Sequence, residues 1–98
     1  MNLTGKHEGN LSVSSDLVIR GMVTGTVTVV DNAHLELNGT VVKDVVVTEG
    51  TSVHIHGMVL GSVINDGGML YIAGTVGAVQ RNAGSTEIAP QALVRNSV

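Results

Sequence analysis

Apolar and polar positions recur along this chain with a period of about 18 residues. The pattern Gly-x-Val begins at Gly21, Gly39, Gly57 and Gly74, so the copies start at nearly equal intervals, the last one residue shorter than the others. Aligning these copies places further apolar residues in columns, namely Leu17, Leu35, Val53 and Leu70; Ile19, Leu37, Ile55, Ile72 and Ile88; Val27, Val45 and Val63; and Val29 and Val47, with Leu11 leading that last column. A fixed short period of this kind is typical of a solenoid.

Within each repeat, apolar and polar residues alternate in short runs. Val23, Val27 and Val29 share one face with Gly21 and Gly25. A period of two indicates short strands with one buried face. Turn-forming residues separate these runs at positions 31–32, 49–50, 65–68 and 82–84. The units are therefore strands joined by turns, and no helical stripe is visible before residue 89.

A repeat of about 18 residues fits three faces of about six residues each, and the sequence predicts an all-β, single-stranded parallel β-helix with four to five coils. Each coil would pair in parallel with the next at the strand spacing of about 4.8 Å. Hairpins in a β-sandwich are the alternative, but Asn-Gly turns joining alternating strands are scarce. We expect one domain over residues 1–98, with the solenoid at 11–88. Residues 1–10 would form a cap or frayed coil, and 89–98 a tail or a cap in which residues 92–94 fold back over the last coil.

The composition limits which side chains can fill the interior and which classes of partner the protein can bind. The chain has a single aromatic residue, Tyr71, and no Phe or Trp, which suits a narrow tube filled by Val, Leu and Ile. With no cysteine, the fold needs neither disulfides nor thiolate metal sites. A net charge of −3 with five scattered basic residues argues against nucleic-acid binding. Neither a signal peptide nor an apolar run long enough to span a bilayer is visible. We expect a soluble, cytoplasmic protein.

The repeat resembles the core of a known family. The run from Leu17 to Val29, with its Gly21-Met22-Val23 and Gly25-Thr26-Val27 units, is similar to the core repeat of bactofilins, and the next two coils repeat it. The resemblance covers about residues 11–88. Bactofilins are bacterial cytoskeletal proteins, and the resemblance implies a right-handed, three-sided β-helix that polymerises end to end.

Outward apolar residues provide a candidate interaction surface. If the inward assignment of the valine columns is right, neighbouring apolar side chains face outward and stack over successive coils. Contiguous exposed apolar patches often mark interaction sites. The predicted stripe consists of Met22, Val42, Val46, Met58, Leu60 and Ile64.

A polar column on another face could carry chemistry. His54 and His56 are two residues apart and would project from the same face of a strand, with Glu36 one coil away. Imidazole and carboxylate groups can bind zinc or copper, or transfer protons. Histidines on a solvated strand are more often ordinary surface residues. We therefore predict no metal, no cofactor and no catalytic site, with His54, His56 and Glu36 as the weak metal candidates.

These features favour a non-enzymatic structural or scaffold protein that associates with itself, as the bactofilin resemblance implies. The alternative is a dedicated protein-binding module, such as an inhibitor or an immunity protein that neutralises a toxin. In either case the expected partner is a protein, and neither a nucleic acid nor membrane insertion is involved.

Overall fold

The computed structural model describes residues 2–90 and 92–97, and this part of the chain contains strands and no helix. The strands are β1 (Asn2–Leu3), β2 (Lys6–His7), β3 (Leu11–Val13), β4 (Leu17–Ile19), β5 (Met22–Val23), β6 (Val27–Val29), β7 (His34–Leu37), β8 (Thr40–Val41), β9 (Val45–Val47), β10 (Ser52–Ile55), β11 (Met58–Ile72), β12 (Thr75–Ile88) and β13 (Leu93–Ser97).

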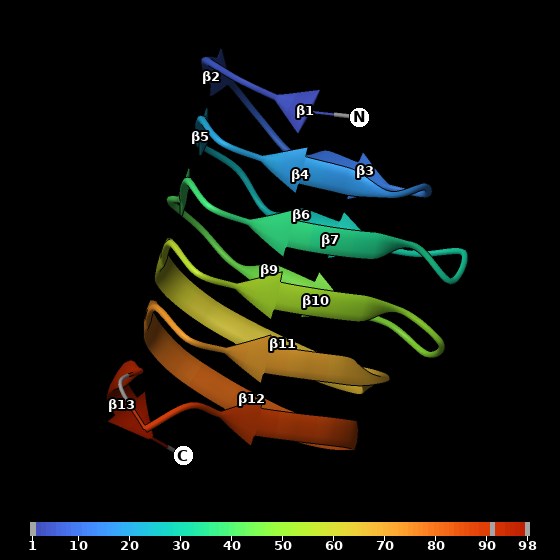
Figure 1. The fold of residues 1–98 in the computed structure, drawn as a ribbon, viewed down its shortest axis with the longest axis vertical. Helices are drawn as coiled ribbons and strands as arrows, with labels where there is room; N and C mark the ends of the chain where they lie inside the picture. Colours follow the sequence, from blue (N-terminus) through green and yellow to red (C-terminus); the bar gives the residue numbers. More distant parts are fainter. Residues whose placement is uncertain (1, 91, 98) are drawn as a thin grey trace.

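All pairings are parallel, and they stack the chain into coils with three faces (Figure 1). Face A consists of β1, β4, β7, β10 and the last residues of β11 and β12. Face B consists of β2, β5, β8 and the first residues of β11, β12 and β13. Face C consists of β3, β6, β9 and the remaining parts of β11, β12 and β13. The predicted parallel β-solenoid is confirmed.

The register shows that the coils differ in length. Leu17 pairs with Leu35 and Leu35 with Val53, so these two coils are equally long. The next coil, from Val53 to its partner Leu70, is one residue shorter, and the coil from Leu70 to Thr86 is shorter by one more. Coil length thus varies around the period read from the sequence. Where β11 pairs with β12, the register shifts lie between residues 59 and 62 and between residues 65 and 69, at the changes from one face to the next. The runs between these shifts stay in register, which keeps their apolar side chains inside.

The interior is built from the predicted columns of branched aliphatic residues. Fully buried side chains include Val23, Val41, Val27, Val45, Val63, Ile19, Leu37, Ile55 and Ile72. One assignment was wrong. Leu11 pairs with Val27, and Val13 pairs with Val29, so Leu11 does not lead the column of Val29 and Val47. The physical reason is that this first coil is two residues shorter than the repeat used for the alignment.

Both terminal segments continue the parallel ladder. β1 and β2 pair with β4 and β5, so residues 2–7 belong to a coil. At the other end β13 pairs with β12, and the backbone N–H of Leu93 donates to the carbonyl oxygen of Gly74 at 3.0 Å. Residues 93–97 therefore extend the stack instead of folding back over it as a cap.

The repeating glycine stands at the corner between faces A and B, where consecutive coils come closest. A Cβ atom at Gly39 would overlap the carbonyl oxygen of Gly21, and one at Gly57 would overlap that of Gly39. These same carbonyl oxygens accept hydrogen bonds of 3.0 Å from the N–H groups of Thr40 and Met58. Only a hydrogen atom fits between the stacked backbones, and this close approach explains why glycine recurs.

A buried asparagine interrupts one apolar column. Asn65 pairs with Val47, is 0% exposed and belongs to β11, although the sequence indicated only a turn there. Its Oδ1 accepts hydrogen bonds from the N–H groups of Gly67 and Gly68 at 3.1 and 2.9 Å. Its Nδ2 donates to the carbonyl oxygen of Ser85 at 2.9 Å and to the hydroxyl of Thr86 at 3.1 Å. Asn65 thus fixes the following turn and ties it to the next coil.

The corner glycine provides a first test. We expect Gly39→Ala to lower the free energy of unfolding by about 3 kcal/mol, because the added methyl group must push two paired backbones apart. Urea denaturation followed by circular dichroism measures this. Asn38→Ala is the matched control, since Asn38 is the exposed neighbour and should change stability little. Equal losses in the two variants would show that the close approach does not require glycine.

The buried amide provides a second test. Asn65→Val restores an apolar column but leaves the N–H groups of Gly67 and Gly68 without their acceptor, so we expect a loss of about 3 kcal/mol. Asn82→Val is the control, because Asn82 makes an exposed hydrogen bond to Asp66 in the neighbouring coil. Urea denaturation of both variants measures the difference. A valine variant as stable as the native protein would mean that packing alone holds this turn.

Candidate interaction surfaces

The two end coils each leave one side of their strands unpaired within the described residues. β1, β2 and β3 each pair with one strand, in the coil that follows them. At the opposite end β13 pairs with β12 alone. Figure 1 shows these outer strands at the top and the bottom of the stack. Unpaired strand edges present N–H and C=O groups that can accept a further strand.

The backbone groups of β3 show which atoms face outward at the N-terminal end. The N–H of Leu11 donates to the carbonyl oxygen of Thr26, and the carbonyl oxygen of Val13 accepts from Val30. Residues 11 and 13 thus direct their backbone groups to the next coil. Because these directions alternate along a strand, the N–H and C=O of Ser12 face the open side.

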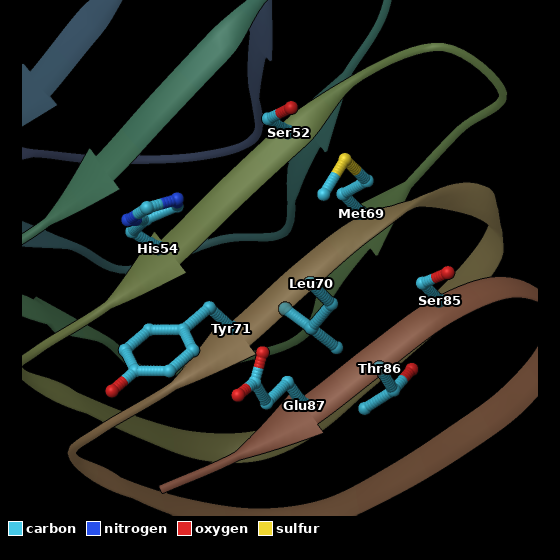
Figure 2. A pocket seen from close by; sticks show the side chains of 8 residues that line it. All are labelled: Ser52, His54, Met69, Leu70, Tyr71, Ser85, Thr86 and Glu87. Atoms are coloured by element: carbon cyan, nitrogen blue, oxygen red, sulfur yellow. The ribbon is translucent and has the colours of Figure 1, made fainter.

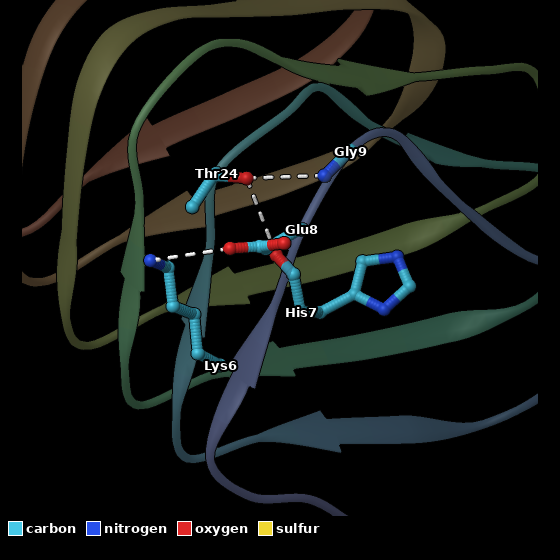
Figure 3. A network of polar contacts seen from close by, with 5 residues as sticks. All are labelled: Lys6, His7, Glu8, Gly9 and Thr24. Atoms are coloured by element: carbon cyan, nitrogen blue, oxygen red, sulfur yellow. Dashed lines mark hydrogen bonds and ion pairs between the residues drawn. The ribbon is translucent and has the colours of Figure 1, made fainter.

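Polar side chains interact with one another and with the backbone at this end. His7 is half-buried and heads a column whose next members, Val23 and Val41, are buried in the following coils. Its Nε2 lies 3.3 Å from the carbonyl oxygen of Asn10. Lys6 and Glu8 form an ion pair at 3.4 Å with highly exposed side chains, which contributes little to stability. Beside it, the N–H of Gly9 donates to the hydroxyl of Thr24 at 3.0 Å (Figure 3).

The predicted apolar stripe lies around the corner between faces B and C. Met22, Met58 and Leu60 are 40%, 40% and 49% exposed. The other three members, Val42, Val46 and Ile64, are half-buried. Met22 and Met58 stand in one column of face B with Thr40 between them, and Val46 and Ile64 are paired neighbours on face C.

The interaction surface predicted from the sequence did not include two exposed apolar side chains. Leu93, 56% exposed, continues the column of Met58 and Thr75, so the stripe extends toward the C-terminal end. Its position could have been found had the tail been aligned with the repeat. Met69, 64% exposed, lies instead on face A beside Ser52.

Face A carries the predicted polar column. Glu36 pairs with His54, His54 with Tyr71, and Tyr71 with Glu87, so these side chains form one ladder across four coils. The ring centroids of His54 and Tyr71 are 5.6 Å apart, and those of His54 and His56 are 6.4 Å apart. Among the described residues, no three His, Cys, Asp or Glu side chains are close enough together to hold a metal ion. The weak metal candidates thus share a face without forming a chelating group.

Two shallow hollows on face A meet at His54. The larger, of about 460 Å³, is bordered by His54, Tyr71, Met69 and Glu87 around the short side chains of Ser52 and Ser85 (Figure 2). The smaller, of about 320 Å³, lies toward the N-terminal end and is lined by Asp16, Val18, His34, Glu36 and His54. Together they form a groove that crosses the strands.

Comparison with known proteins gives no relative: no family model matches the chain, and neither the curated proteins nor the solved structures contain a match. The part of the chain that the structure describes also contains no helix of the length and apolarity needed to cross a membrane.

The exposed stripe can be tested by charge substitution. We expect the double variant Met58→Lys and Leu60→Lys to keep its melting temperature within a few degrees, because both side chains already face solvent. Its binding of a hydrophobic dye such as ANS should fall. The control is Met69→Lys on face A, which should leave the stripe intact. Unfolding of the double variant would mean that another part of the chain covers these residues.

Proposed function

We propose that this protein is a non-enzymatic structural protein that associates with itself end to end. The observation that carries the proposal is the set of strand edges left unpaired within the described residues, on β1, β2 and β3 at one end and on β13 at the other. The resemblance of the repeat to the bactofilin core supports the same class of function. The proposal assigns no catalytic residue.

The two ends have matching layouts. The last coil presents the end of β12 on face A and β13 on faces B and C, and the first coil presents β1, β2 and β3 on the same three faces. A second copy placed after the last coil would continue every face in parallel at the same spacing of about 4.8 Å. Such a contact is heterologous, joining different surfaces of the two copies. Heterologous contacts that do not close into a ring produce open filaments.

Sedimentation velocity over a wide concentration range tests the proposal. We expect the native protein to form species whose sedimentation coefficients increase with concentration. Ser12→Pro should abolish this growth, because it removes an N–H that faces the open side, and proline is tolerated at such edge positions. Ser12→Ala keeps the N–H and is the matched control. A native protein that stays monomeric up to millimolar concentration, or a proline variant that assembles normally, would contradict end-to-end association.

A protein-binding module, such as an inhibitor or immunity protein, is the second candidate function. The exposure of Met22, Met58 and Leu60 in one stripe favours it, because exposed apolar patches often mark sites of protein interaction. If this function is the correct one, the native protein stays monomeric in sedimentation and the stripe variant Met58→Lys and Leu60→Lys loses a stoichiometric complex with the partner.

A further inference from the structure

The groove on face A has a structural origin in the order of side chains along its columns. In one column His34, Ser52, Met69 and Ser85 follow each other from coil to coil. In the adjoining column the order is Glu36, His54, Tyr71 and Glu87. Ser52 therefore lies beside His54 and Ser85 beside Glu87, and these differences in side-chain length hollow the surface of the sheet (Figure 2).

The groove is lined by several acidic side chains. They are Asp16, Glu36 and Glu87, all exposed, and among the described residues neither Lys nor Arg lines either hollow. Between the carboxylates lie Tyr71 and His54, whose rings are 5.6 Å apart. Carboxylates attract cationic groups, and the face of a tyrosine ring adds to that attraction. The groove is therefore complementary to positive charge joined to apolar surface.

The spacing of the carboxylates points to an elongated ligand. Glu36 and Glu87 belong to the same column and are three coil steps apart, through His54 and Tyr71. At about 4.8 Å per step this separation is about 14 Å. An extended peptide advances about 3.4 Å per residue, so side chains four residues apart are also separated by about 14 Å. The residue midway between them would face the rings and the exposed Met69.

We propose that the groove on face A binds an extended basic segment of another protein, running along the solenoid axis across the strands. Two Lys or Arg side chains four residues apart would reach Glu36 and Glu87, and an apolar side chain midway would pack on Tyr71 and Met69. On face A, β7 and β10 are paired on both sides, whereas the end of β12, which carries Glu87, pairs with β11 alone among the described residues. Because the bound segment crosses the strands, it is recognised by side chains and adds no strand to the sheet. This site is separate from the stripe, and at Glu87 it adjoins the last coil.

Fluorescence anisotropy with labelled decapeptides tests the site on the full chain. The first peptide carries two lysines four residues apart with a leucine midway between them, and Gly and Ser elsewhere. The second has the same composition but places its two lysines next to each other, and the third replaces both lysines with glutamate. We expect the first peptide to bind about fivefold more tightly than the second, and the third not to bind.

Matched variants distinguish binding in the groove from nonspecific attraction of a basic peptide to an acidic protein. Glu36→Gln with Glu87→Gln should weaken binding of the first peptide about fivefold. Glu49→Gln with Asp31→Asn makes the same change in net charge at exposed turn residues outside the groove, and should leave affinity nearly unchanged. Circular dichroism and melting temperatures of both double variants establish that they are folded.

Three results would overturn the proposal. The first is absence of binding of the first peptide up to millimolar concentration. The second is an equal loss of affinity in the two double variants, which would indicate nonspecific attraction to an acidic protein. The third is displacement of the peptide by a neutral hexasaccharide from both the native protein and the Glu36→Gln and Glu87→Gln variant, which would make the groove a saccharide site. Because Ser12 lies outside the groove, the Ser12→Pro variant should bind the peptide normally, whether or not end-to-end association occurs.

Discussion

The ladder of backbone hydrogen bonds from coil to coil is the constraint on which the rest of this structure depends. Each strand pairs in parallel with the equivalent strand of the next coil, so consecutive coils must follow the same path at a spacing of about 4.8 Å. That spacing explains the glycines at the corner of faces A and B, where a side chain at Gly39 would overlap the carbonyl oxygen of Gly21. Each coil closes after three short faces, and the interior between them is filled by Val, Leu and Ile.

The same ladder decides where this protein can interact. Because equivalent positions stack in register, a surface feature is a column of side chains extended over several coils. The stripe through Met22 and Met58 and the groove through Glu36, His54 and Tyr71 both arise in this way. Within the described residues, β1, β2, β3 and β13 each have one unpaired edge. End-to-end association would use the backbone groups of the end strands, and recognition on a side face would use columns of side chains.

Deviations from the repeat are as informative as the repeat itself. The first coil is two residues shorter than the repeat, which moves Leu11 into the column of Val27. Asn65 occupies an apolar column because its four hydrogen bonds to Gly67, Gly68, Ser85 and Thr86 satisfy the amide inside the tube. In both cases the local pattern is ambiguous. An alignment with a fixed period cannot reveal that one coil is shorter than the others. An asparagine followed by glycines is also typical of an ordinary turn, so the sequence does not show that Asn65 is buried.

The sequence by itself determined the parallel solenoid, its three faces, the inward valines such as Val45 and the outward positions such as Met58. Periodicity alone is sufficient for these, because burial alternates along each strand and repeats with each coil. Only the tertiary structure decided that β13 continues the stack, that Leu93 joins the column of Met58, and that Ser52 and Ser85 hollow face A between larger side chains. These features depend on which residues become neighbours across coils of unequal length, and that pairing is set by the packing of the whole chain.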